Sequence, residues 1–196
     1  NSDPSGKLSN LMAAKAEHQS YAPLLISGRN ESAFLPLKEI QILHLDYLEQ
    51  KWLTDSFTKK FDRLKIKLPQ RYIENLVRIT SGHPYYSRLA FEQTILIHSL
   101  TGSIPGSKEM RNGLLAAEKD YIEKVWEDLS HNKEYSLTML ALSEGSKNIY
   151  QRLKSKKINV ARAQKSLEGM GYLMKNESGG YIIADPMLKY WLRKIA

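Results

Sequence analysis

The chain of 196 residues contains no cysteine. This absence excludes disulfides, cysteine-ligated zinc sites and a cysteine nucleophile, and it is typical of a cytoplasmic protein. No apolar run approaches the roughly 18 residues that a membrane-spanning helix needs. The first residues show no charged segment followed by an apolar one, so no signal peptide is evident. We therefore expect a cytoplasmic protein that has no membrane partner.

Motifs for catalysis are also missing. A P-loop (Walker A) requires GxxxxGK[ST], whose backbone N–H groups wrap phosphates. Gly6-Lys7 is followed by Leu8, and the position five residues before Gly6 is Asn1, so this segment fails the motif. No hydrophobic strand ends in the paired acids of a Walker B motif. The histidines lack metal-ligand spacing, and we expect no metal site.

Helical periodicity dominates what is present and predicts a mainly α-helical fold. Two short apolar runs, 21–27 and 39–45, predict strands. Apolar residues then recur at helical spacing and predict a bundle of about four helices, at 46–64, 72–79, 84–100 and 110–129. Gly82 can end one helix in a left-handed conformation, and Pro84 suits the first turn of the next helix.

Residues 132–196 show a different order of predicted elements. Three short helices come first, at 135–142, 149–153 and 158–169. Two short strands then flank a turn at 176–180, and Asp185-Pro186 opens a final helix. The order of helix, helix, helix, hairpin and helix is that of a winged helix-turn-helix.

Positive charge is concentrated in this C-terminal region. The whole chain has a net charge of +8, and residues 133–196 contain 12 Lys or Arg against 5 Asp or Glu, which is +7. Basic side chains bind nucleic-acid phosphates, so DNA is a candidate partner. A solvated basic face is the alternative interpretation. The candidate DNA-binding residues are Lys147, Arg152, Lys154, Lys156, Lys157, Arg162, Lys165 and Lys175.

Several segments resemble P-loop ATPases of the AAA+/STAND group, above all the archaeal-type ATPases. The string LVRITSGHPYYSRLAFEQTIL (76–96) is similar to their helical lid. Segments that resemble parts of their winged helix lie at 135–145, 166–173 and 181–192. Residues 22–28 look like the strand that carries the sensor-1 residue, and residues 28–34 look like the loop that precedes the last strand of the core.

The resemblance implies three regions. Residues 1–45 would be the remnant of an α/β P-loop core with two strands. Residues 46–131 would be a helical lid domain, and residues 132–196 a winged helix-turn-helix domain. ATP with Mg²⁺ would be the cofactor of the full-length protein, whereas no cofactor is expected for this chain alone.

The resemblance also implies roles for individual residues. In the lid, Gly82, His83 and Pro84 would contact the nucleotide base. Ser27 would lie near the γ-phosphate as a sensor-1 residue. Arg29 is a candidate finger that reaches a neighbouring site, with Lys38 as another candidate.

Three functions remain open from the sequence. The chain could be the lid and winged-helix portion of an ATP-dependent switch that binds DNA or a partner. The missing ATPase core or a neighbouring subunit would then hold the triphosphate. It could instead be a free-standing DNA-binding regulator with a helical dimerisation or effector module. The third function is an autoinhibitory or protein-interaction winged helix, with Tyr190 and Trp191 at its interface to the core. Because Walker A and Walker B are both missing, ATP hydrolysis by this chain is left undecided.

Overall fold

The computed structural model describes residues 47–145, 148–176 and 178–196. These residues form a mainly helical fold with a two-stranded antiparallel sheet, which confirms the predicted mainly α class. The predicted strands at 21–27 and 39–45 lie outside the described residues. None of the helices in the described ranges is long and apolar enough to cross a membrane.

The first group of helices follows the predicted pattern with one exception. It comprises α2 (Gln50–Arg63), α3 (Gln70–Thr80), α4 (Pro84–Thr101), α5 (Ser107–Ala117) and α6 (Lys119–Ser130). The prediction of one helix over 110–129 is wrong, because the chain leaves the helical conformation at Glu118, with φ −113° and ψ 12°. The Glu118 side chain accepts a hydrogen bond from Tyr85 on α4, which holds this break against the neighbouring helix.

The second group has the order that the sequence predicts. It comprises α7 (Lys133–Ser143), α8 (Ile149–Leu153), a 3-10 turn η2 (Lys154–Lys156), α9 (Val160–Gly169), β1 (Leu173–Lys175), β2 (Tyr181–Ile183) and α10 (Pro186–Ile195). The hairpin pairs Leu173 with Ile183 and Lys175 with Tyr181. Side-chain oxygens of Asn132, Asn148, Asn159 and Asp185 cap four of these helices by accepting backbone N–H groups.

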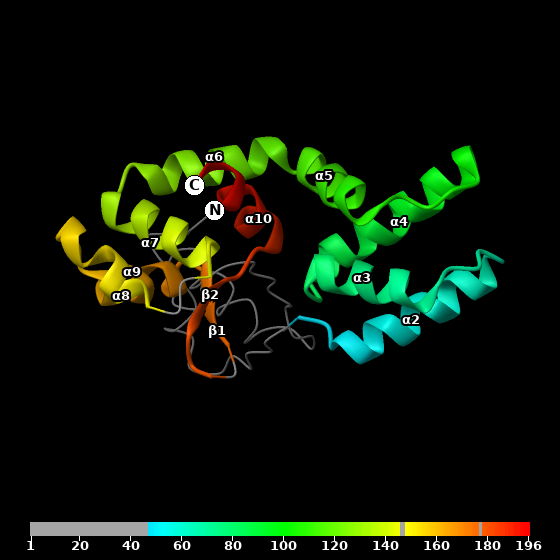
Figure 1. Ribbon diagram of the computed structural model, residues 1–196, viewed down its shortest axis with the longest axis horizontal. Coiled ribbons are helices and arrows are strands. Elements are labelled where there is room, and N and C mark those ends of the chain that lie inside the picture. Colours follow the sequence, from blue (N-terminus) through cyan, green and yellow to red (C-terminus); the bar gives the residue numbers. More distant parts are fainter. Residues whose placement is uncertain (1–46, 146–147, 177) are drawn as a thin grey trace, which may run out of the picture.

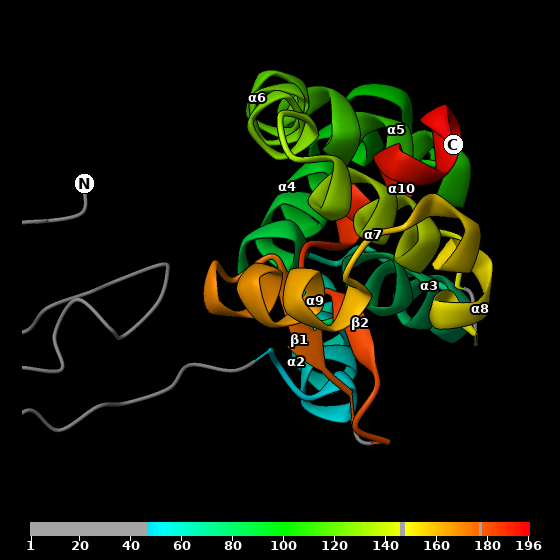
Figure 2. The same ribbon diagram turned by 90° about the vertical axis from the view of Figure 1, so that its left-hand side faces the viewer.

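One main hydrophobic core joins the two groups. Its buried residues come from α2 to α7, α9, both strands and α10. Helix α10 lies between the groups and contacts α3, α5, α6, α7 and β2 (Figure 1). Figure 2 views the molecule from the end that α8, α9 and the hairpin form. A smaller cluster holds α8 and α9 on α7 through Ala141, Ile149, Leu153 and Val160. The predicted boundary at residue 132 therefore crosses a continuous core, and it stays a prediction.

Truncation of Leu192 in α10 should unfold both groups together. Leu192 is fully buried, so Leu192→Ala should lower the free energy of unfolding by about 2–5 kcal/mol. The matched control is Ile195→Ala in the same helix. Ile195 is 47% exposed, and its loss should change stability by less than about 0.5 kcal/mol. Urea unfolding followed by circular dichroism measures both values, and equal losses would contradict the central place of α10.

Candidate functional site

The connection between α3 and α4 is a tight joint of three residues, 81–83. Ser81 ends α3 in the left-handed region with φ 52°, and Gly82 follows with φ 76°. The N–H of His83 donates to the carbonyl of Thr80 at 2.9 Å, and Pro84 begins α4. The sequence predicts the left-handed turn at Gly82 and the first-turn proline, and the structure adds a second left-handed residue at Ser81.

A close backbone approach requires glycine at position 82. The N–H of Leu48 donates to the carbonyl oxygen of Gly82 at 2.8 Å. A Cβ atom on Gly82 would lie 2.4 Å from the Leu48 carbonyl oxygen, well inside van der Waals contact. The segment that leads into α2 is therefore fastened directly onto the joint.

His83 lies between two tyrosine rings. Its ring centroid is 5.3 Å from that of Tyr47 and 4.6 Å from that of Tyr86. Its Nδ1 atom is buried and finds no hydrogen-bond partner among the described residues. Burial lowers the pKa of His83, while the nearby carboxylates of Asp185 and Glu118 oppose that shift. The imidazole is therefore neutral near pH 7.

The same tyrosines connect the joint to α10. The hydroxyl of Tyr86 donates to Asp185 Oδ2 at 3.0 Å, and the hydroxyl of Tyr47 donates to the carbonyl of Ala184. Asp185 Oδ1 accepts the N–H groups of Met187 and Leu188 at 2.7 and 2.9 Å, which caps α10. Burial raises the pKa of Tyr47 to about 12, and burial raises the pKa of Tyr86 as well. Both hydroxyls therefore stay protonated and able to donate.

The three residues predicted to contact the nucleotide base therefore lie together, but they differ in solvent exposure. Gly82 is buried beneath Leu48, His83 is half-buried, and Pro84 is exposed. The other predicted ATPase residues, Ser27, Arg29 and Lys38, lie outside the described residues. Tyr47 and Tyr86 belong to the same cluster, but their spacing in the sequence does not reveal their contacts with Ala184 and Asp185.

The predicted DNA-binding residues are all exposed where the structure describes them, and they fall into two classes. Three of them hold ion pairs with carboxylates of the same region: Arg152 with Glu144, Arg162 with Glu134, and Lys175 with Glu168. Lys147 lies outside the described residues.

The Arg162 pair fastens α9 to α7. Glu134 Oε2 accepts from Arg162 Nη2 at 2.8 Å and from Nε at 3.2 Å, and Glu134 Oε1 accepts the N–H of Asn159. The hydrogen bond from Arg162 lowers the pKa of Glu134. The structure therefore gives Arg162 a positioning contact within the chain in addition to its predicted contact with DNA.

The remaining lysines are free to meet an external anion. Lys154, Lys156, Lys157 and Lys165 make no ion pair with the described part of the chain. Lys154, Lys156 and Lys157 form the turn between α8 and α9, which we call the basic corner. Lys157 is held there in the left-handed region with φ 52°.

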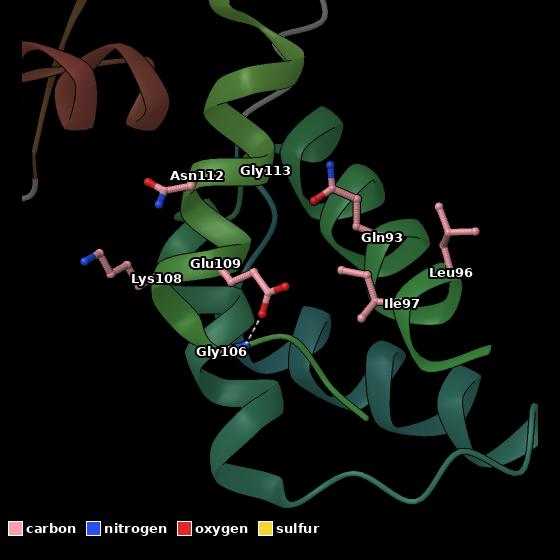
Figure 3. Close-up of a pocket in the computed structure, with 8 residues that line it drawn as sticks. All are labelled: Gln93, Leu96, Ile97, Gly106, Lys108, Glu109, Asn112 and Gly113. Atoms are coloured by element: carbon pink, nitrogen blue, oxygen red, sulfur yellow. Dashed lines mark hydrogen bonds between the residues drawn. The ribbon is translucent and has the colours of Figure 1, made fainter. Parts of the chain in front are cut away.

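A pocket of 820 Å³ lies elsewhere, between α4 and α5 (Figure 3). Gln93 and Ile97 line it from α4. Across it, the Glu109 carboxylate turns back to the N–H of Gly106 at the start of α5. None of the predicted site residues lines this pocket. No group of three or more His, Cys, Asp or Glu suited to a metal occurs within the described ranges.

Comparison with known proteins shows similarity in fold to a solved structure. No model of a protein family matches the chain, and a search of curated proteins found no match. Among solved structures, a Walker-type ATPase of Pyrococcus abyssi is similar, with a TM-score of 0.59 and 18% sequence identity over 75% of this chain. The match covers 42% of that ATPase, so the chain spans less than half of its length. The chain therefore shares the fold of part of a P-loop ATPase.

Substitution of Gly82 tests the close approach at the joint. Gly82→Ala should be more destabilising than Gly102→Ala, because both residues have positive φ but only Gly82 has a neighbour within 4 Å of the added Cβ. We expect Gly102→Ala to cost about 1 kcal/mol of unfolding free energy. Gly82→Ala should cost about 1–3 kcal/mol more. Equal losses in urea unfolding would show that Leu48 does not press on the joint.

Protonation of His83 should make the fold sensitive to acid. Because its pKa is lowered on folding, the unfolded chain binds more protons as the pH falls below about 6.5. The contribution of His83 to stability is constant at higher pH and declines as the pH falls through this range. Urea unfolding between about pH 5 and 8 should show a shallower pH dependence for His83→Gln. A wild-type pH dependence for His83→Gln would contradict this prediction.

Proposed function

We propose that this chain is the lid and C-terminal effector portion of an ATP-dependent switch of the AAA+/STAND type. The α3–α4 joint is the element that responds to the nucleotide base. The α7–α10 region is a winged helix-turn-helix that binds DNA. The shared fold with part of a Walker-type ATPase supports this proposal at the level of architecture.

One observation carries the proposal. The joint at Gly82–Pro84 contacts the segment that enters the helical region, and Tyr86 in the adjoining first turn of α4 contacts the start of α10. Leu48 is hydrogen-bonded to Gly82, and Tyr86 is hydrogen-bonded to Asp185. A displacement of the joint on nucleotide binding therefore moves the N-terminus of α10, which packs on α7 and β2. The contact gives a nucleotide-dependent movement a direct route to the DNA-binding region.

The basic corner supplies the phosphate contacts in this proposal. Its lysines are exposed and unpaired within the described chain, whereas Arg152 and Arg162 are already engaged by carboxylates. Phosphate neutralisation by lysine makes binding fall steeply with salt. DNA should therefore dock mainly at the turn between α8 and α9, with Lys165 beside it on α9.

Nothing in the described chain favours the autoinhibitory function over the switch. Trp191 packs edge-on against Trp126 of α6, with ring centroids 6.0 Å apart. Tyr190 lies against the cationic groups of Arg111 and Lys194. Both side chains, which that function would place at an interface to the core, are engaged inside the chain.

The test is a joint measurement of ATP hydrolysis and DNA binding by the 196-residue chain. We expect no hydrolysis above background, and duplex DNA binding that weakens as salt rises. Replacing Lys154, Lys156 and Lys157 by Gln should reduce the log–log salt slope by about two to three. The control replaces Lys119, Lys124 and Lys133 by Gln, which removes the same charge elsewhere and should change the slope by less than about one.

Two results would contradict the proposal separately. Hydrolysis of ATP by the chain alone at an ordinary enzymatic rate would overturn its interpretation as a portion of a switch. No binding to duplex DNA at low salt would overturn the DNA partner. In a polypeptide that also carries a P-loop core, Tyr86→Phe should preserve hydrolysis and abolish the effect of ATP on DNA affinity.

A further inference from the structure

A second basic surface lies at the connection between α2 and α3. Residues 59–71, which we call the basic tip, contain six basic residues and one acidic residue, Asp62. The basic residues are Lys59, Lys60, Arg63, Lys65, Lys67 and Arg71. The near-neutral total charge of residues 1–132 conceals this cluster, because acidic residues elsewhere in that region balance it.

All six basic side chains of the tip are exposed. None of them makes an ion pair with any residue that the structure describes. Lys60 lies 5.4 Å from the centroid of the Phe91 ring, and the others have no such contact among the described residues. Ion pairs with described residues therefore do not neutralise the positive charge of the tip.

The backbone conformation just after α2 favours glycine, but the residue at this position is Lys65. After α2, the N–H of Lys65 donates to the carbonyl of Asp62, and the N–H of Ile66 donates to that of Phe61. This pair of bonds is a Schellman motif, in which glycine usually occupies the left-handed position. Here Lys65 occupies it with φ 58°. A lysine therefore occupies a position that glycine would adopt more easily, as Lys157 does in the basic corner.

An exposed aromatic ring shares the helix face of two tip residues. Trp52 precedes Lys59 by seven residues and Arg63 by eleven, so the three side chains lie along one stripe of α2. Leu53, Phe57 and Phe61 take the opposite, buried face. Trp52 is 56% exposed. Cations along a backbone path with an exposed aromatic ring suit a strand whose bases are unstacked from a partner.

We propose that the basic tip and Trp52 bind single-stranded nucleic acid. The lysines and Arg63 neutralise successive phosphates, and Trp52 stacks on a base. A duplex offers the same phosphates, but its bases are paired and cannot reach a ring on a helix surface. Figure 1 shows the α2–α3 connection at one end of the long axis and α8 and α9 at the other, so the tip and the basic corner are separate surfaces.

Fluorescence anisotropy of the 196-residue chain tests this proposal with three labelled probes. They are a single strand of about 20 nucleotides, a duplex of the same length, and polyglutamate as an acidic-protein mimic. The tip variant replaces Arg63, Lys65 and Lys67 by Gln. It should bind the single strand at least about tenfold more weakly at low salt, with a salt slope reduced by about two. The triple variant at Lys119, Lys124 and Lys133 removes equal charge and should bind as the wild type does.

Two single substitutions separate binding from folding. Lys65→Gly should weaken binding to the single strand while raising the Tm by about 2–4 °C, because glycine relieves the left-handed position. A merely structural role for Lys65 would not produce these opposite changes. Trp52→Ala should weaken single-strand binding by about fivefold or more and leave the salt slope unchanged, because the ring carries no charge.

Each other result overturns the proposal. If the tip variant binds the single strand as tightly as the wild type does, the tip is not a binding surface. If the control variant loses as much affinity as the tip variant, the effect is due to net charge alone. If the tip variant loses as much affinity for the duplex as for the single strand, the assignment to a single strand is overturned. If polyglutamate binds as tightly as the single strand does, and the tip variant weakens both equally, the surface binds an acidic protein instead. The variant at the basic corner, measured beside these, reports on DNA binding by the α7–α10 region independently.

Discussion

The carboxylate of Asp185 serves two elements at once, and the arrangement of the molecule depends on it. One oxygen caps α10 by accepting two backbone N–H groups, and the other accepts the hydroxyl of Tyr86 from α4. The start of α4 in the first group is thereby fixed to the start of α10 in the second group. Because α10 packs against both groups, the orientation of the two groups is set where α10 begins.

The joint between α3 and α4 leaves no space for a side chain at position 82, and its histidine is neutral. Gly82 leaves no space for a side chain, so Leu48 can hydrogen-bond to its carbonyl. His83 fills the space between two protonated tyrosines as a neutral ring, and burial of its Nδ1 atom makes the charged form unfavourable. Direct contacts therefore hold the segment that enters α2, the joint and the start of α4 together.

Positive charge is concentrated on two surfaces, one in the C-terminal region and one at the basic tip. The basic side chains of the two surfaces differ in their ion-pair partners. In the C-terminal region, Glu144 just after α7 engages Arg152, and Glu134 on α7 engages Arg162, so those arginines help to hold α8 and α9 in place. The lysines of the basic corner and of the basic tip have no such partners among the described residues. Lys65 and Lys157 both occupy left-handed backbone positions, one on each surface. At both positions an exposed lysine occupies a backbone conformation that glycine adopts more easily.

The sequence by itself determined the hairpin, the turn at Gly82 and the helices apart from the interrupted one at 110–129, because periodicity and left-handed turns are local. It did not predict the break at Glu118, whose side chain accepts a hydrogen bond from Tyr85 of α4. Nor could it show that Tyr47 and Tyr86 converge on His83 and residues 184–185, more than a hundred positions away from His83. Contacts of that range depend on how α10 packs, and only the tertiary structure decided which residues the joint touches and which basic side chains remain free.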